Sequence, residues 1–313
     1  STANGKSQIT ALLNSPEGLA LNGPLPELLS PGAWGAMRKL GLEGRIGARD
    51  LELLVNTGEE QVEFSLAGML LLHQVSIAAA PGFAHGKGEL EIQSLRWRNA
   101  EDFQAKLTLN NGEGTVSGFQ MTQARAQIAL TPEQIRWTDL DAKLLGGRVH
   151  TRGKGLDEKP FVGQLRIGLT SSAPLFLHVL LDGLDLGRVR EELGLGGDLD
   201  GKIHGELNFV SRSPNPADYK GYARLLVEKG ALGAVPILSR MWRAAGIRPP
   251  IFDSGKFTLR ANPKTHRGRL RMEGFQLVHP LLSVLGKGWV GLDGYLDLKV
   301  TVRSGFVPLL GWG

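Results

Sequence analysis

Long runs of strict apolar and polar alternation between residues 250 and 303 constrain the fold of this chain more than any other feature. In the run 296–303, Leu and Val hold every even position, and Asp, Lys, Thr and Arg hold the odd ones. The same alternation occurs over 256–261 and 269–273. Successive side chains of a strand point to opposite faces, so a period of two predicts antiparallel strands with one apolar and one polar face.

The alternation also occurs in the preceding part of the chain, where it predicts a meander of strands joined by short turns. At Gln93-Ser94 the phase slips, which predicts a bulge. Asn110-Asn111-Gly112 has the composition of a tight hairpin turn. The 43 Gly are about twice the average usage of ~7% and fit many turns and bulges. The alternating runs are 61–66, 89–92, 125–130, 139–144 and 164–169.

Three segments predict short helices among these strands. Leu25 to Leu40 has its apolar residues roughly on one side and is interrupted by Pro31-Gly32, and Asp185 to Leu193 has helical spacing over a shorter length. Leu232 to Ala245 is the clearest amphipathic segment. Its apolar stripe would either pack over the sheet or form a plug that lies in the mouth of a groove and moves or touches a membrane. The stripe is made of Val235, Leu238, Met241 and Trp242.

Charge and composition restrict the classes of partner. The net charge of +5 is a mild excess of Lys and Arg, spread along the polar faces of the strands. This distribution indicates a solvated basic face rather than a nucleic acid site. An anionic membrane surface would also fit it. We therefore expect no nucleic acid partner. The chain has no Cys, which excludes disulfides and Cys-based metal sites. The sequence has no run of about 20 apolar residues, so it predicts no membrane-spanning helix.

Motifs of enzyme chemistry are weak, and we expect neither catalytic residues nor a cofactor. Gly286-Lys287-Gly288-Trp289-Val290-Gly291 matches a dinucleotide-binding fingerprint by letters, but that motif needs a helix after it, and the alternation over 292–302 predicts a strand. The seven His are scattered, with no pair at the spacing of metal ligands. The several Asp between 182 and 200 suit turns and helix caps better than a cation loop, so no metal site is expected.

The order of elements in the last third of the chain resembles the C-terminal region of the AsmA-like family of bacterial envelope proteins, which includes the translocation and assembly module proteins. A strand that ends in Gly is followed by an amphipathic helix and then by Gly-led strands. Residues 183–186 and 199–201 are similar to the part that usually precedes this region. The segments that carry the resemblance are 222–230, 235–238, 254–257, 286–292 and 295–300.

The resemblance implies a mainly β fold in which a long, curved antiparallel sheet is folded lengthwise into a taco-like groove with an apolar floor, accompanied by two or three short amphipathic helices. Along the chain we expect an N-terminal helix and sheet region (1–120), a middle β repeat with a short helix (121–215) and the AsmA-like region (216–313), within one continuous sheet. The implied location is the periplasm or cell envelope, with anchorage to the inner membrane by a segment absent from this chain.

Two functions remain open. The first is a non-enzymatic groove that binds lipid acyl chains and moves or organises phospholipid between membranes of the envelope, close to a membrane surface. The second is an envelope assembly scaffold whose core is filled by its own side chains and which binds partner proteins. The expected groove floor consists of Phe257, Leu259, Leu270, Met272, Val290, Leu292, Leu296, Leu298 and Val300.

Overall fold

The structure is a computed structural model of the chain, and it describes most of its residues. The following paragraphs concern these residues only. The described ranges are 7–20, 42–57, 62–77, 83–99, 101–116, 118–169, 174–192, 194, 199–213, 215–231, 251–265, 267–291 and 295–304.

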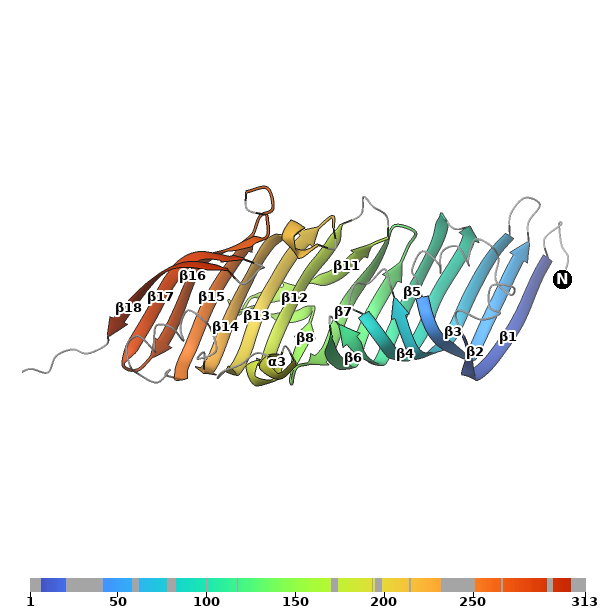
Figure 1. The fold of residues 1–313 in the computed structure, drawn as a ribbon. Helices are drawn as coiled ribbons and strands as arrows, with labels where there is room; N and C mark the ends of the chain where they lie inside the picture. The colour runs from blue at the N-terminus through green and yellow to red at the C-terminus, as the bar shows by residue number, and fades with distance from the viewer. Residues whose placement is uncertain are drawn as a thin grey trace, which may run out of the picture. The chain divides into compact units, whose positions relative to one another are not determined.

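In this described part, sixteen strands form one sheet, which confirms the prediction of a mainly β fold. The path of hydrogen-bonded neighbours runs β1-β2-β3-β4-β5-β6-β7-β11-β12-β13-β14-β15-β16-β17-β18. Neighbours are consecutive along most of the chain, and the successive pairs from β1 to β7 and from β13 to β18 are antiparallel. The meander predicted from the alternation is therefore the observed topology (Figure 1).

The chain divides into two compact units. Unit 1 comprises residues 1–144, 149–152 and 162–176, and unit 2 comprises 145–148, 153–161 and 177–313. These units are groups of residues that contact one another in space, whereas the three regions expected from the sequence are segments of the chain. That three-region division stays a prediction.

Unit 1 contains the first seven strands and β11. Most of these strands are longer than the mode of about 5–6 residues for globular proteins, and β4 reaches 17 residues. Figure 1 shows β1 to β7 side by side in chain order. The strands are β1 (Ser7–Ala20), β2 (Leu42–Thr57), β3 (Val62–Ile77), β4 (Phe83–Asn99), β5 (Asp102–Val116), β6 (Phe119–Leu130), β7 (Gln134–Leu144) and β11 (Gln164–Gly168).

Bulges interrupt most of these long strands. Each of the described strands β2 to β7 contains one residue other than Gly with a positive φ, and the pairing register shifts beside most of them. A bulge bends its strand and increases the local twist. The sheet of unit 1 is thus bent repeatedly along its strands. The residues are Asp50, Gln74, His85, Asn111, Gln123 and Asp139.

One of these bulges corrects a sequence-based expectation. Asn110-Asn111-Gly112 forms no hairpin turn, because β5 continues through it to Val116. Asn111 has a φ of 50°, and the register with β6 shifts between Leu109 and Gly112. Tight hairpin turns and bulges both need residues that tolerate the left-handed conformation, so the same composition suits either. The bulge predicted at Gln93-Ser94 is confirmed by a register shift between Ile92 and Ser94.

A row of apolar side chains crosses unit 1 from strand to strand. Directly paired residues of antiparallel strands lie on the same face, so the chain of pairs traces that face. The row contains no charged or polar residue over eight strands. Its members, in order of pairing, are Ala11, Leu53, Leu66, Leu95, Ala105, Leu130, Ile135 and Ile167.

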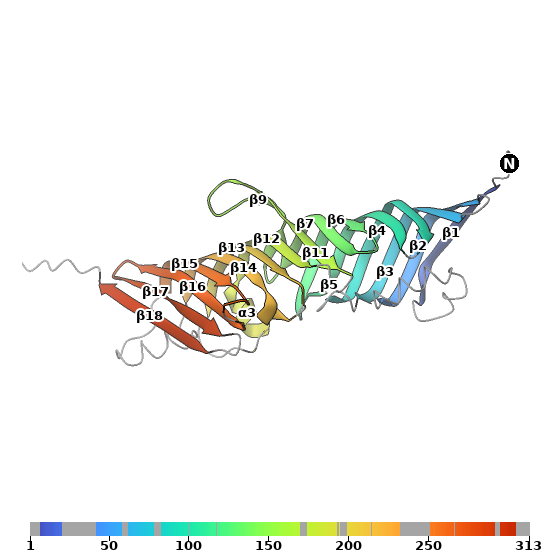
Figure 2. The same cartoon turned by 90° about the horizontal axis from the view of Figure 1, so that it is seen from above.

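Unit 2 contains the remaining strands of the meander and the helix α3. The short β9 (Arg152–Lys154) and β10 (Pro160–Val162) form a separate two-stranded sheet, and β9 is labelled in Figure 2. The meander strands are β12 (Leu175–Asp185, of which 177–185 belong to this unit), β13 (Asp200–Ser211), β14 (Lys220–Ala231), β15 (Ile251–Ala261), β16 (Arg269–His279), β17 (Leu282–Gly291) and β18 (Leu296–Ser304). The other elements are β8 (Gly147–His150, of which 147–148 belong to this unit), α3 (Leu186–Glu192) and the 3-10 turn η1 (Pro216–Asp218).

The helix predicted over Asp185 to Leu193 is confirmed as α3, seven residues long. Asp185 caps it, since the backbone N–H of Arg188 donates to Asp185 Oδ1 at 3.2 Å. The helices expected over 25–40 and 232–245 lie outside the described residues. None of the described helices is long and apolar enough to cross a bilayer.

Candidate functional site

The expected floor residues of unit 2 come together on one face of β15 to β18. Phe257 pairs with Phe275, and Leu259 pairs with Met272. Across the next two pairings, Leu270 lies opposite Val290, and Met272 and Leu298 both pair with Gly288. Because paired residues share a face, the register places these apolar side chains in adjoining rows. Val300 pairs with Gly286 in the neighbouring row.

This face contains no charged side chain across the paired rows of β13 to β18. One row runs Leu207, Ala223, Leu259, Met272, Gly288, Leu298; the next runs Gly205, Leu225, Phe257, Phe275, Gly286, Val300. A third runs Ile203, Val227, Gly255, Leu277, Val284, Val302. The apolar face of unit 2, defined by these three rows, offers dispersion and hydrophobic contact and no hydrogen-bonding side chain.

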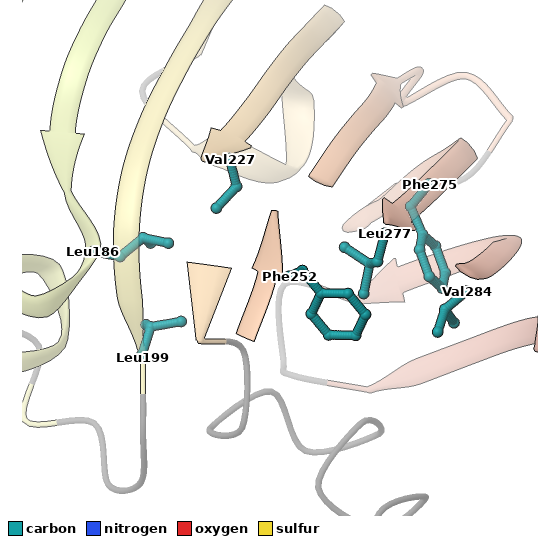
Figure 3. Packing of buried hydrophobic residues seen from close by; sticks show 7 residues of the cluster. All are labelled: Leu186, Leu199, Val227, Phe252, Phe275, Leu277 and Val284. Atoms are coloured by element: carbon teal, nitrogen blue, oxygen red, sulfur yellow. The ribbon is translucent and has the colours of Figure 1, made fainter. Parts of the chain in front are cut away.

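Part of the apolar face is filled by the unit's own residues. Leu277 and Val284 are 0% exposed and Phe252 is 1% exposed. Figure 3 shows the Phe252 ring between Leu186, Leu199 and Val227 on one side and the residues of β16 and β17 on the other. The α3 residue Leu186 therefore helps to close one end of the face. The buried cluster consists of Leu186, Leu199, Val227, Phe252, Phe275, Leu277 and Val284.

The expected floor residues themselves are only partly buried. Phe257, Met272, Leu298 and Val300 pack against the buried cluster without being sealed by it. Leu259, Leu270 and Val290 are half-buried as well. Seven of the nine expected floor positions are thus partly open to solvent.

A glycine shapes the centre of this face. The ring of Phe275 lies across Gly286, where a Cβ would collide with the ring atoms. Phe257 stacks beside Phe275 with ring centroids 6.1 Å apart and planes 18° apart. A large aromatic side chain covering a cross-strand glycine is a known way to fill the gap that glycine leaves in a sheet.

Two further predictions fall outside what the structure describes. Leu292 and the stripe of Val235, Leu238, Met241 and Trp242 belong to segments beyond the described residues. Leu296 pairs with Val290 through its backbone. The places of Leu292 and Leu296 in the floor and the contact of the stripe with a membrane stay predictions.

The polar face of unit 2 contains one buried carboxylate. Glu206 is 6% exposed, accepts a hydrogen bond from the Tyr222 hydroxyl at 2.5 Å, and lies 3.0 Å from Arg224 Nη2. His178 Nε2 lies 3.5 Å away, and Phe161 packs against the His178 ring at 4.4 Å. The Tyr222 contact, followed by the charge of Glu206, raises the pKa of Arg224 and holds its guanidinium in the charged form. The cluster is a paired, satisfied network.

A second polar group connects α3 to β13. Lys202 Nζ donates to Asp185 Oδ2 at 2.8 Å, and this contact lowers the pKa of Asp185. Nearby, His204 lies 2.9 Å from Asp182 Oδ1 and 3.8 Å from Glu228 Oε2. Each of these groups has an ionic or hydrogen-bonded partner, as structural ion pairs do.

The described residues contain no group of three or more His, Asp or Glu arranged to hold a metal ion. The letters of the dinucleotide fingerprint fall within β17, and the next described element is the strand β18, so the motif lacks the helix N-terminus that would hold a pyrophosphate. These positions instead alternate between the two faces of the sheet.

Sequence reasoning left the apolar row of unit 1 out of the candidate site. The alternating runs identified from the sequence include only some of its residues, among them Leu66, Leu130 and Ile167. The signal that could have found the row is the recurrence of that alternation at similar spacing through seven strands. In unit 1, Trp97 and Phe103 add a stacked pair at 4.9 Å on the same face.

Comparisons with protein-family models, curated proteins and solved structures found no match to this chain.

Proposed function

We propose that this protein binds lipid acyl chains along the apolar face of unit 2, and that it moves or organises phospholipid in a bacterial envelope. The resemblance to AsmA-like proteins motivates the location and the cargo. Catalysis has no part in the proposal, because binding by such a face needs only apolar contact. Each methylene transferred from water to this face would contribute about 0.8 kcal/mol.

The observation that carries the proposal is the uncharged face of β13 to β18 with seven half-buried floor residues. A sheet with one apolar face must cover it with other elements, close on itself or hold an apolar ligand. The buried cluster covers one part of the face, and the half-buried floor residues leave contact area for acyl chains.

The test is to purify the protein without harsh detergent, extract it with organic solvent and identify lipids by mass spectrometry. Leu298→Arg places a charge in the floor row and should abolish co-purified lipid and the binding of a fluorescent fatty acid. Thr301→Arg is the matched control, since Thr301 lies on the opposite face of the same strand and is exposed. We expect the control to bind lipid like the unaltered protein.

Lipid binding by Leu298→Arg at the unaltered level, with both variants folded, would contradict the proposal. So would a washed protein that contains no lipid and takes up no fatty acid probe.

The second candidate is an assembly scaffold for partner proteins. The full burial of some side chains of the apolar face favours it. Leu277, Val284 and Phe252 are sealed by the protein itself, which is how a self-filled core would look. The two functions differ in two results. A scaffold would still bind its partner proteins after Leu298→Arg, and it would yield no lipid on extraction.

A further inference from the structure

Net charge is distributed unevenly among the strands. The four strands β15 to β18 contain seven Lys and Arg and three Asp and Glu, a net of +4 out of +5 for the whole chain. The seven strands β1 to β7 contain nine Lys and Arg and eleven Asp and Glu, a net of −2. The strands β15 to β18 are therefore basic, whereas β1 to β7 are slightly acidic.

The cations of these four strands lie on one face, opposite the apolar face. Arg260 pairs with Arg271, which pairs with Trp289 and then Asp297. Lys287 pairs directly with Lys299. All the cations are exposed. We call this surface the basic face; its cations are Lys256, Arg260, Arg269, Arg271, Lys287, Lys299 and Arg303.

Like charges stand directly opposite each other in this face, at Arg260 and Arg271 and at Lys287 and Lys299. Such pairs destabilise a sheet by a few tenths of a kcal/mol or more. Only Arg260 has an ion pair among the described residues of these strands, with Glu273 at 2.9 Å. A face that gathers cations, most of them without an ion pair among the described residues, at a cost in stability fits an anionic partner.

Apolar and aromatic residues interleave with these cations. On β17, Leu285 and Trp289 flank Lys287 on the same face. Val278 on β16 is 36% exposed, and Tyr295, just before β18, is 57% exposed with the Arg269 guanidinium 5.9 Å above its ring. Trp and Tyr prefer the boundary between lipid headgroups and acyl chains, where Lys and Arg meet phosphate.

From this combination we propose that the basic face of β15 to β18 docks on an anionic phospholipid bilayer. A nucleic acid would use the cations but leave Val278 and Leu285 without a partner, and the Tyr295 ring already has Arg269 on one side. The docking does not depend on what the apolar face holds, since the two faces are opposite sides of the same strands.

The experiment is flotation of the full chain with phosphatidylcholine vesicles and with vesicles that also contain phosphatidylglycerol. We expect binding to the anionic vesicles alone, weakened by added salt. Each unit of positive charge near an anionic membrane surface strengthens binding about fivefold. Lys299→Glu changes the charge by two units and should therefore weaken that binding about 25-fold. The same change converts a like-charge pair with Lys287 into an opposite pair, so the midpoint of unfolding should rise rather than fall.

Lys143→Glu is the matched control, because Lys143 is exposed on β7 in unit 1. It should leave vesicle binding unchanged. Equal loss in both variants, no loss in Lys299→Glu, or equal binding to neutral vesicles would overturn the proposal. Binding to duplex DNA at physiological salt without binding to vesicles would overturn it in favour of a nucleic acid.

The outcome can be separated from that of the acyl-chain proposal. Lys299→Glu should still yield lipid on extraction, and Leu298→Arg should still float with anionic vesicles. If Leu298→Arg retains its lipid while Lys299→Glu loses flotation, the docking face stands and the acyl-chain face fails.

Discussion

Glu206 is the residue at which the polar face of unit 2 is most sensitive to change. Its carboxylate is buried and holds both Tyr222 and Arg224. Glu206→Gln keeps the size but leaves Arg224 without a counter-charge, so we expect a loss of about 1–3 kcal/mol in unfolding free energy. Glu273→Gln removes a carboxylate from the exposed pair with Arg260 and should cost less than about 1 kcal/mol. Urea unfolding of the two variants checks the difference, and equal losses would contradict it.

Gly288 is the residue at which the backbone of β17 is most constrained. Its φ is +153°, and an added Cβ would collide with the carbonyl oxygen of Asp297 on β18. Gly288→Ala should therefore destabilise unit 2 by about 1–3 kcal/mol, the usual cost of such a backbone conformation. Gly274→Ala is the control in the neighbouring strand, since nothing lies within 4 Å of the Cβ position there. A thermal unfolding midpoint equally low in both variants would refute the steric argument.

At the scale of elements, α3 depends on Asp185 for its start. The carboxylate caps the helix and accepts from Lys202 of β13. Asp185→Ala should lose about 1 kcal/mol at pH 7, while Asp185→Asn keeps a capping oxygen and loses less. The pKa of Asp185 is lowered in the folded state, so its ionic contribution is present above pH about 4 and is lost as the pH falls through the folded value.

The measurement is unfolding free energy against pH for the unaltered protein and Asp185→Asn. The difference between the two should be constant near neutrality and should shrink towards zero in acid. A difference that grows in acid would show that the contact with Lys202 does not stabilise the charged carboxylate.

The strands could be predicted from sequence wherever the alternation stays in phase. It does so over 256–261 and over 296–303, and both lie within observed strands. The full strand lengths could not be predicted, because bulges reset the phase within a strand. In β2 and β5, Asp50 and Asn111 mark positions where one continuous strand looks like two shorter ones.

The same effect hid part of the candidate site. Leu270 and Met272 belong to the expected floor, but strict alternation would continue to Gly274 and Gln276 rather than to Phe275 and Leu277. A register shift between Met272 and Phe275 moves the phase by one residue. Further along, Gly286 interrupts the apolar run, and only the structure shows the Phe275 ring filling its place.

At the scale of the whole molecule, strands interact almost entirely with their neighbours in the sheet. Stability in such an arrangement is a sum of local terms, as in repeat proteins. Leu277→Ala, at a position with 0% exposure, should cost about 2–5 kcal/mol and should lower hydrogen-exchange protection in β13 to β18. Amides of β2 to β6 in unit 1 should keep their protection.

Hydrogen exchange followed by mass spectrometry of peptides from each unit checks this localisation. Ala124→Gly, at a fully buried position in unit 1, is the reciprocal variant and should loosen β5 to β7 instead. A uniform loss of protection in both variants would show that the chain unfolds as one cooperative body.

The first and last strands each have a neighbour on one side only, since β1 is paired with β2 alone and β18 with β17 alone among the described strands. In a closed barrel the strand number, tilt and stagger are linked, but an open meander has no such requirement. Duplication of a single hairpin at either end would lengthen the ribbon while leaving the existing pairings intact. Genes for chains of this architecture can therefore grow or shrink in steps of two strands, and relatives that differ in size are expected to differ by whole hairpins.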